Sequence, residues 1–477
     1  MLDADVIVLG AGEAGALVAS TAVDDGRRVA LAYLSPWGST CLNHGCVPSK
    51  FLIHRARVAA TARDGDRFRV TTGDVRVDLD GIVDDKVAML DAHREQSWTA
   101  AKGADSLTML EGRAEFLSSR EVRVGGEIVH ADRIFIATGM RPSVPSIPGL
   151  EEGPWFTNET VMDLRDVPGH LLVLGGGYVG CELGQAFRRF GAEVTLIQRP
   201  VRLLPREEPD ASAVLERAFT AEGIRVLTRH EVLAIRWEGD RPILEARSSD
   251  GSSVEIEGTH LLVATGRTPN TAGLALERAG VESDGRGFVR VDDRLRTTAP
   301  RIWAVGDVNG LQPFTRVCQE EAKLAYADAF SDDHTAMRRD ALAHAIFTDP
   351  EVGSVGLTER AARERGDDVV AGLVPVDRFE KAELMGETRG FVKFVADAAS
   401  HRLLGCHVVG PFGADLVYGA AIVMRSGGRL DDLAMAVGVF PTLQEGIEGT
   451  ARAVLRKVAP EEVSGPLVTA SHKGGGI

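Results

Sequence analysis

The chain of 477 residues has only five cysteines, few aromatic residues and no long hydrophobic run. An odd number of cysteines in so long a chain excludes the dense disulfide framework of a small secreted domain. No apolar stretch reaches the roughly 20 residues that a membrane-spanning helix needs, and residues 1–9 lack the basic start and long apolar core of a signal peptide. We therefore expect a cytoplasmic protein with no membrane partner.

Positive charge is also scarce. The 54 Lys and Arg residues are outnumbered by 69 Asp and Glu residues, which gives a net charge of −15. A surface of this sign repels phosphate backbones, so we expect no nucleic-acid partner. The hydrophobic content of 44% is that of an ordinary globular protein, and the length suits about three domains.

Two of the five cysteines lie close together, in the segment G-S-T-C-L-N-H-G-C-V-P-S-K at residues 38–50. The others are scattered singly: Cys181, Cys318 and Cys406. No second Cys or His pair completes a tetrahedral site, so we expect no metal site. Periodicity predicts a helix over 47–62, which places Cys41 and Cys46 at a helix N-terminus, where the dipole favours the reactive thiolate. The pattern favours a redox-active pair.

Two glycine-rich turns each follow a short apolar run. Residues 6–9 lead into G-A-G-E-A-G at 10–15, and residues 171–174 lead into G-G-G-Y-V-G at 175–180. Each turn precedes a helical segment. Strand, glycine turn and helix in this order bind the pyrophosphate of a dinucleotide at the helix N-terminus. Two copies predict two dinucleotides in one chain.

These features resemble the flavin-dependent pyridine nucleotide-disulfide oxidoreductases. Their signature GGTCxNxGCxPSK is similar to residues 38–50, and their ATGxxP segment is similar to the sequence at 137–142 and again at 264–269. T-A-P-R-I-W-A-V-G-D at 298–307 resembles the second FAD motif of the family. Residues 347–359 are similar to the start of its C-terminal interface domain. The resemblance covers roughly residues 3–458.

The resemblance implies an α/β fold of two Rossmann-like dinucleotide-binding domains, for FAD and NAD(P)H, with an α+β C-terminal dimerisation domain. The expected divisions are an FAD-binding domain over 1–150 and 268–340, an NAD(P)H-binding domain over 151–267, an interface domain over 341–463 and a flexible tail over 464–477. It further implies a homodimer whose active sites are shared across the interface. One helix outside these motifs is expected near 83–102, and two short strands near 107–110 and 121–124.

The resemblance also assigns roles within the site. NAD(P)H would reduce FAD, and FAD would pass two electrons to a Cys41–Cys46 disulfide. Cys46 would be the thiolate beside the flavin, and Cys41 the thiol that meets a small-molecule substrate. Lys50 would pair with Glu182. The cofactor contacts implied are Gly10, Gly12, Gly15, Thr40, Thr138, Gly139, Asp307, Gly175, Gly177, Tyr178, Gly180, Gly266 and Arg267.

Two strand ends depart from the common dinucleotide pattern. The second strand, 29–33, ends at Tyr33 instead of the acid that usually holds the adenosine ribose. The strand at 194–198 ends in glutamine and is followed by Arg199 and Arg202. Because guanidinium groups suit a 2′-phosphate, we expect NADPH to be preferred over NADH.

The largest departure is Phe440. Disulfide reductases of the family carry H-P-T-x-x-E, in which histidine protonates the leaving thiol, whereas residues 440–445 read F-P-T-L-Q-E and keep Glu445. General acid–base catalysis is worth roughly 10²–10⁴ in rate. His44, between the two cysteines, could replace the acid, but we expect its ring to point away from the sulfurs.

Three interpretations follow from Phe440. In the first, the protein is an NADPH reductase whose substrate needs no proton from histidine, such as a metal–thiolate, a quinone or a low-pKa disulfide. Mercuric reductase is such a relative, but this chain has no cysteine pair at its C-terminus. In the second, Phe440 excludes protons, as in 2-ketopropyl-coenzyme M oxidoreductase/carboxylase. In the third, the protein is a non-catalytic flavin-bearing binding or sensing protein. We favour the first.

Overall fold

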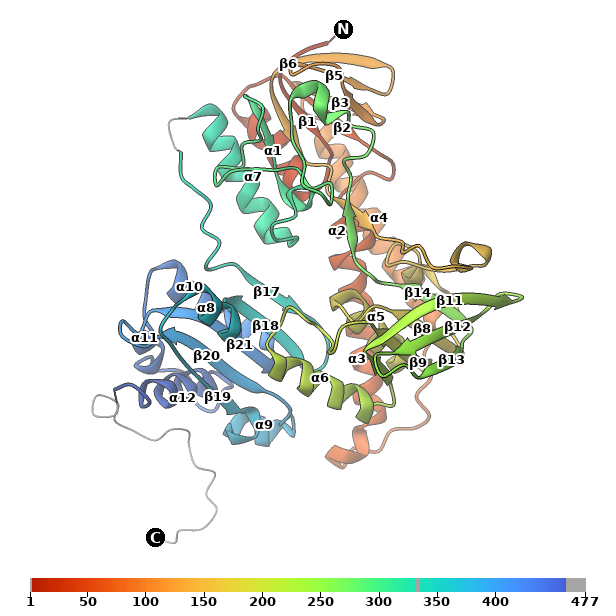
Figure 1. Ribbon diagram of the computed structural model, residues 1–477, viewed down its shortest axis with the longest axis vertical. Helices are drawn as coiled ribbons and strands as arrows, with labels where there is room; N and C mark the ends of the chain where they lie inside the picture. Colours follow the sequence, from red (N-terminus) through yellow and green to blue (C-terminus); the bar gives the residue numbers. More distant parts are fainter. Residues whose placement is uncertain (1, 332–333, 460–477) are drawn as a thin grey trace.

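The computed structural model describes residues 2–331 and 334–459 and shows three groups of strands and helices (Figure 1). The first is built on a seven-stranded sheet of order β3-β2-β1-β6-β5-β4, with β16 also paired to β6. Its strands are β1 (Leu2–Leu9), β2 (Val29–Tyr33), β3 (Leu107–Glu111), β4 (Ala114–Phe116), β5 (Glu121–Val124), β6 (Glu127–Ile136) and β16 (Ile302–Ala304). Because β16 lies beside β6, two segments far apart in the sequence complete one sheet.

Five helices accompany this sheet: α1 (Glu13–Asp24), α2 (Thr40–His44), α3 (Cys46–Arg63), α4 (Leu79–Lys102) and α7 (Thr315–Phe330). Helices α1 and α7 pack against one another and share a hydrophobic core with β1 and β2. Residues 6–9 of β1 are fully buried, as expected for a strand covered on both faces of a parallel sheet.

The second group contains a parallel four-stranded sheet of order β10-β9-β8-β14 and an antiparallel three-stranded sheet of order β11-β12-β13. Its elements are β8 (His170–Leu174), α5 (Tyr178–Phe190), β9 (Glu193–Gln198), α6 (Pro209–Ala221), β10 (Arg225–Thr228), β11 (His230–Glu238), β12 (Arg241–Ser248), β13 (Ser253–Glu257) and β14 (His260–Val263). The chain enters through β7 (Met140–Pro142) and leaves through β15 (Arg267–Pro269), and these two strands pair with each other. The two segments that resemble ATGxxP therefore meet side by side.

The third group is an antiparallel five-stranded sheet of order β17-β18-β21-β20-β19, which shares a hydrophobic core with α10, α11 and α12. Its elements are β17 (Ala343–Ile346), β18 (Glu351–Gly356), α8 (Glu359–Arg365), β19 (Val369–Pro375), α9 (Glu380–Met385), β20 (Phe391–Asp397), β21 (Leu403–Gly410), α10 (Gly413–Arg425), α11 (Leu430–Ala434) and α12 (Gln444–Leu455). The two parallel-stranded groups and this antiparallel group confirm the predicted fold class. The predicted tail, 464–477, lies outside the described residues.

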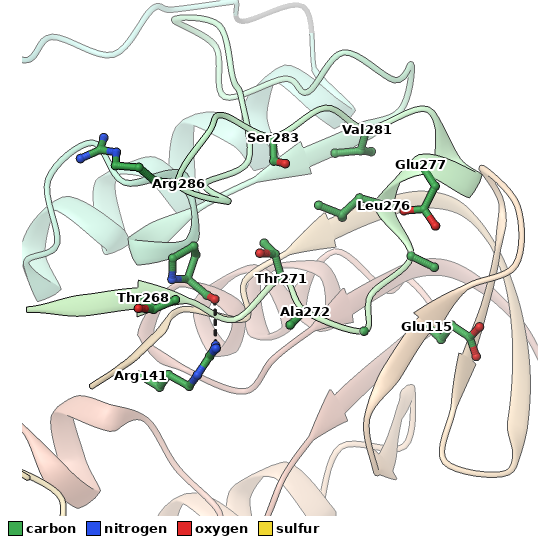
Figure 2. A pocket seen from close by; sticks show the side chains of 13 residues that line it. Glu115, Arg141, Thr268, Thr271, Ala272, Leu276, Glu277, Val281, Ser283 and Arg286 are labelled. Carbon is green, nitrogen blue, oxygen red and sulfur yellow. Dashed lines mark hydrogen bonds between the residues drawn. The ribbon is translucent and has the colours of Figure 1, made fainter. Parts of the chain in front are cut away.

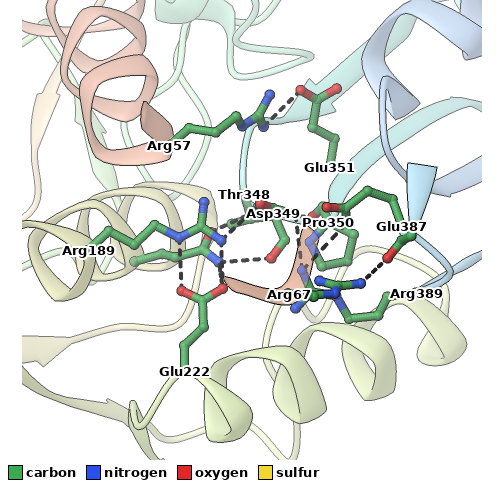
Figure 3. A network of polar contacts seen from close by, with 12 residues as sticks. Arg57, Arg67, Arg189, Glu222, Thr348, Asp349, Pro350, Glu351, Glu387 and Arg389 are labelled. Carbon is green, nitrogen blue, oxygen red and sulfur yellow. Dashed lines mark hydrogen bonds and ion pairs between the residues drawn. The ribbon is translucent and has the colours of Figure 1, made fainter. Parts of the chain in front are cut away.

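A largely buried arginine, Arg189, ties the second group to the third (Figure 3). Arg189 of α5 donates through Nε and Nη2 to the two carboxylate oxygens of Glu222, at 2.9 and 2.7 Å. Nη2 also donates, at 2.9 Å, to Oδ2 of Asp349, a residue that lies just before β18. Gln185, one helical turn before Arg189, exchanges two 2.8 Å hydrogen bonds with the backbone of Asp349. Helix α5 is therefore fastened along one face to the start of the third sheet.

The helix boundaries differ from the sequence prediction at two places. The expected helix over 47–62 begins at Cys46 and is preceded by the separate short helix α2. The expected helix over 83–102 begins at Leu79, because the Asp78 side chain caps it by accepting from Gly81 N at 3.1 Å. In the described part of the chain, no helix is both long and apolar enough to cross a membrane.

Candidate active site

The two neighbouring cysteines are presented by consecutive helices. Cys41 is the second residue of α2, which Ser39 caps by accepting from Leu42 N at 3.0 Å. Cys46 is the first residue of α3. Gly45 joins the helices, and a Cβ there would lie 2.9 Å from Thr40 O, closer than a side chain tolerates. The tight junction brings both sulfurs into one cavity.

The hydroxyl of Thr315 lies between the two sulfurs. Thr315 is the first residue of α7, and its Oγ1 is 3.2 Å from Cys41 Sγ and 3.5 Å from Cys46 Sγ. The hydrogen bond from Cys41 lowers the pKa of Cys46 to about 6 against the effect of burial, with help from Thr315 and the charge of Lys50. The same hydrogen bond and burial raise the pKa of Cys41. In the reduced pair, Cys46 is therefore the thiolate and Cys41 the thiol.

A buried ion pair lies beside the thiolate. Lys50 Nζ, one turn along α3 from Cys46, is 2.7 Å from Glu182 Oε2 on α5. The other oxygen of Glu182 accepts from Phe347 N at 2.8 Å. The ring of Phe347 also lies under the ammonium group of Lys50, whose Nζ is 4.7 Å from the ring centroid. The pair expected from the sequence is present, and it joins α3, α5 and the turn after β17.

The first glycine turn leaves one side open. Gly10 has φ +114° and a Cβ there would lie 2.4 Å from Ala137 O, while a Cβ on Gly15 would lie 1.9 Å from Gly10 O. A Cβ on Gly12 would meet nothing within 4 Å. The outer two glycines permit the turn and the close packing of α1, and the middle one faces open space. This arrangement fits a pyrophosphate at the N-terminus of α1.

The second glycine turn has the same geometry. Gly175 has φ +109° and a Cβ there would lie 2.3 Å from Ala264 O, and a Cβ on Gly180 would lie 1.9 Å from Gly175 O. Gly177 again faces open space. The two turns are thus built alike at the N-termini of α1 and α5, and each fits one dinucleotide.

A cavity of about 230 Å³ contains both sulfurs and reaches the first glycine turn. The expected site residues that line it are Gly12, Thr40, Cys41, Cys46, Lys50, Gly139, Tyr178, Glu182, Arg267 and Asp307. Among the described residues, Thr138 Oγ1 and Arg267 Nε are buried without a hydrogen-bond partner. Burial also raises the pKa of Asp307, against the attraction of Arg267. Buried polar groups are normally hydrogen-bonded, so those that lack a protein partner can find one in a bound ligand. Their position beside the glycine turn fits the polar ribityl chain of FAD.

Comparison with known proteins decides the family. Residues 4–328 match the family model described as pyridine nucleotide-disulphide oxidoreductase, and residues 342–451 match the dimerisation domain of the same family. The chain belongs to this family. Its members are enzymes that use FAD and a pyridine nucleotide, so the family and enzyme class predicted from residues 38–50 are confirmed.

Similar members of the pyridine nucleotide-disulphide oxidoreductase family include a mercuric reductase of Streptomyces lividans, 34% identical over 95% of this chain and 97% of its own length. A dihydrolipoyl dehydrogenase of Haloferax volcanii is 33% identical over 94% and 96%. The solved structure of the HOCl-induced flavoprotein disulfide reductase RclA from Escherichia coli superposes with a TM-score of 0.84, at 29% identity over 94% of this chain and all of that one.

The end of β9, where the nicotinamide cofactor was expected to be recognised, makes hydrogen bonds within the protein. Gln198 is buried, and its Oε1 accepts from Gly176 N at 2.8 Å while its Nε2 donates to Arg202 O at 3.3 Å. Arg199 is 78% exposed and lies 3.5 Å from Glu231. Arg202 donates to Pro205 O, and its Nε is buried without a partner in the described part of the chain. Binding of a 2′-phosphate by Arg199 and Arg202 stays a prediction.

Phe440 lies away from the cysteines within one chain. Its side chain is 59% exposed, in a segment with the exposed residues Met435, Val437 and Val439, and it does not line the cavity that the described residues form around the sulfurs. Glu445, of the F-P-T-L-Q-E segment, accepts from Lys381 N at 2.9 Å, at the start of α9. The structure of one chain therefore brings neither residue to Cys41.

Sequence reasoning missed two residues that contact the site. Thr315 follows the second FAD motif by eight positions and carries no signal of its own beyond its place before a helix. Phe347 was recognised within the interface motif, but its contact with Lys50 depends on folding. His44 lines the cavity and its carbonyl accepts from Asn158 Nδ2 at 2.8 Å, while the direction of its ring stays a prediction. Gly266 lies at the crossing point, where its carbonyl accepts from Ser143 N at 2.9 Å.

A second pocket, of about 600 Å³, lies between β4 and the segment after β15 (Figure 2). Arg141 donates there to Pro269 O at 3.0 Å. It contains no cysteine, and it is separate from the dithiol cavity. Among residues 2–331 and 334–459, no cluster of three His, Cys, Asp or Glu side chains is placed to hold a metal ion.

Proposed function

We propose that the protein is an FAD-dependent NADPH oxidoreductase that passes electrons through a Cys41–Cys46 disulfide to an electrophile that needs no proton from histidine. A metal–thiolate, a quinone and a low-pKa disulfide are such electrophiles. The observation that carries the proposal is the asymmetry of the pair: Thr315 and Lys50 stabilise a thiolate at Cys46, and Cys41 keeps its proton. When bound, FAD would supply the transfer of two electrons from NADPH to the disulfide.

The residues of the chain divide the work on each side of that transfer. Two electrons and one proton break the S–S bond and leave Cys46 as the thiolate and Cys41 as the thiol. With a disulfide substrate, Cys41 then loses its proton and attacks one substrate sulfur, which expels the first thiolate. Cys46 next attacks Cys41, which restores the disulfide and releases the second thiolate. Because Phe440 has no exchangeable proton, both leaving thiolates take theirs from water.

A substrate that needs no proton from histidine is supported by the presence of the dithiol pair and by phenylalanine at position 440. Good leaving groups, such as a thiolate of low pKa or one bound to a soft metal ion, do not require protonation. Several relatives are mercuric reductases, and one solved structure of RclA is a Cu(II) complex. We therefore propose a thiolate-bound soft metal ion as the leading substrate of this class. Residues 407–477 contain no cysteine, so the proposal assigns no step to a second cysteine pair.

We also propose a homodimer, in which Phe440 of one subunit reaches the cysteine cavity of the other. The family match to a dimerisation domain supports this. So does the apolar segment of Met435, Val437, Val439 and Phe440, whose side chains are 59–98% exposed in one chain. Exposed apolar residues in such a row are a feature of protein interfaces. A dimer of this kind places Phe440 where relatives place histidine.

The preference for NADPH is supported by the strand end after β9. The strand ends at the neutral Gln198, whose Oε1 accepts from Gly176 N, instead of at an acid that would repel a 2′-phosphate. Arg199 is 78% exposed, and its ion pair with Glu231 Oε1 is long at 3.5 Å; Arg202 donates through Nη2 to Pro205 O and has an Nε without a partner in the described residues. All five cysteines are unpaired in this structure, which therefore describes the reduced form of the Cys41–Cys46 pair.

An anaerobic titration tests the proposal. The purified protein should be yellow, and NADPH should produce a broad long-wavelength absorbance band from the Cys46 thiolate beside oxidised flavin. Steady-state NADPH oxidation should then be fastest with thiolate-bound soft metal ions, slower with quinones and slowest with glutathione-like disulfides. A colourless protein, or NADPH oxidation that depends on CO2 instead of on these acceptors, would overturn it.

A further inference from the structure

The strand end that lacks the usual ribose-binding acid has a carboxylate beside it. β2 ends at Tyr33, and the neighbouring parallel strand β3 ends at Glu111 in register with it. Ser35 Oγ donates to Glu111 Oε1 at 2.6 Å, and Tyr33 Oη donates to Glu111 Oε2 at 3.4 Å. The exposed carboxylate is therefore fixed at the carboxyl edge of the sheet, 78 positions away from Tyr33 in the chain.

The surrounding aromatic side chains hold this arrangement in place. The ring of Tyr33 lies edge-on to Trp37 and Trp98, with centroids 5.3 and 5.7 Å away, and the two tryptophans are 5.3 Å apart. Trp37 Nε1 also donates to Ser97 Oγ at 2.9 Å. Burial and the nearby carboxylate raise the pKa of Tyr33, so its hydroxyl stays a donor. Tyr33 thus supports Glu111 and supplies no negative charge.

The carboxylate also lies on the correct side of the glycine turn. Gly10 N donates to Ala32 O at 3.0 Å, and Gly112 N donates to Tyr33 O at 2.9 Å, so the ends of β1, β2 and β3 are adjacent. Neighbouring strands are about 4.8 Å apart, a distance that a glutamate side chain spans. In dinucleotide folds the ribose lies at this edge, next to the pyrophosphate on the glycine turn.

We propose that Glu111, held by Ser35, takes the place of the missing acid and accepts hydrogen bonds from the adenosine ribose hydroxyls of FAD. Oε1 has a short bond from Ser35, whereas Oε2 has only the long bond from Tyr33, so Oε2 keeps acceptor capacity for a ribose hydroxyl. Ribose recognition has moved one strand outward in this chain. The inference rests on the proposed function only in that FAD is the cofactor bound to the first glycine turn.

The test measures FAD binding to the flavin-free protein, by quenching of flavin fluorescence, and not activity. Glu111→Gln should weaken FAD binding about 10- to 100-fold, because a hydrogen bond to a charged group is lost. Asp105→Asn removes an exposed acid near the opposite end of β3 and should leave the Kd unchanged. Ser35→Ala should weaken binding by a smaller factor, because the carboxylate loses its support.

A modified cofactor separates a direct contact from a general charge effect. Wild-type protein should bind FAD more tightly than an FAD analogue whose adenosine ribose lacks the 2′-hydroxyl, and Glu111→Gln should reduce that difference. Equal Kd values for FAD in wild-type protein and Glu111→Gln would overturn this inference alone. Glu111 would then be a surface acid that is hydrogen-bonded to Ser35 and does not contact FAD. Failure of wild-type protein to bind FAD would overturn the proposed function and this inference with it.

Discussion

Lys50 Nζ lies 2.7 Å from Glu182 Oε2, although 132 positions separate the two residues in the chain. Glu182 is only 4% exposed, so the ammonium group largely compensates its buried charge. The same ammonium group helps to lower the pKa of Cys46. The ammonium group of Lys50 therefore stabilises two negative groups, the carboxylate of Glu182 and the thiolate of Cys46.

Removing the Lys50 charge should raise the pKa of Cys46. In Lys50→Met the thiolate loses its nearest cation, so the long-wavelength band of the two-electron-reduced protein should be weaker at pH 7. The visible spectrum after anaerobic addition of one equivalent of NADPH measures this. Lys323→Met, on the exposed side of α7, is the control and should keep the band. A band of unchanged strength in Lys50→Met would show that Thr315 and Cys41 suffice.

The long-wavelength band should follow the titration of Cys46. The pKa of this thiol is lowered to about 6, so the thiolate is present above that pH and is lost as the pH falls through it. The band should be constant between pH 7.5 and 8.5, half lost near pH 6 and nearly absent at pH 4.5. Spectra of anaerobically reduced protein across this range check it. A midpoint near 9, that of an ordinary thiol, would contradict the asymmetry of the pair.

Thr315 is expected to act on the same equilibrium through its hydroxyl. Thr315→Val keeps the shape and removes the hydrogen bond to the Cys46 thiolate, so the midpoint of the band should move to higher pH. A shift of about one pH unit corresponds to about 1.4 kcal/mol. Thr315→Ser keeps the hydroxyl and should restore the wild-type midpoint. If Val and Ser variants behave alike, the contact is only one of packing.

Phe440→His should speed the reduction of ordinary disulfides by about 10²- to 10⁴-fold, because the leaving thiolate then receives a proton from the protein. The first half of the cycle, reduction of the dithiol by NADPH, should keep its rate, and stopped-flow absorbance measures it separately. Val439→His adds an imidazole to the neighbouring exposed position and should give no such gain. No increase in disulfide turnover for Phe440→His would show that another step limits the wild-type protein.

The network around Arg189 should matter for stability rather than for electron transfer. Arg189→Met leaves Glu222 and Asp349 without their shared partner; because these carboxylates are 19% and 28% exposed, the cost should lie between the roughly 1 kcal/mol of a surface pair and the roughly 3–5 kcal/mol of a buried one. Thermal unfolding should show a lower Tm. Arg365→Met, which removes a partly exposed pair with Asp367, should cost no more than about 1 kcal/mol. Equal Tm values for the two variants would show that this contact does not fasten α5.

Much of the dinucleotide chemistry is readable from the sequence because it depends on neighbouring residues. A positive φ at Gly10 and the close packing of Gly15 are consequences of a strand, a tight turn and a helix in direct succession. The spacing of Cys41 and Cys46 likewise placed the pair at the N-terminus of the helix that became α3, although the separate helix α2 was not predicted. Local spacing therefore predicted the turns and the dithiol pair, and the resemblance of the motifs to known ones predicted the family.

What the sequence could not supply are contacts between segments that only folding brings together. Thr315 reaches Cys41 from 274 positions away, and Phe347 reaches Lys50 from the turn after β17. Glu111 lies beside Tyr33 because two parallel strands end in register. No periodicity or spacing along the chain encodes these neighbours, since they are set by how helices and strands pack. The sequence by itself determined which chemistry is present and, through the resemblance, that Cys46 is the thiolate; the tertiary structure decided which groups lower the pKa of Cys46 and which acid stands at the edge of the sheet.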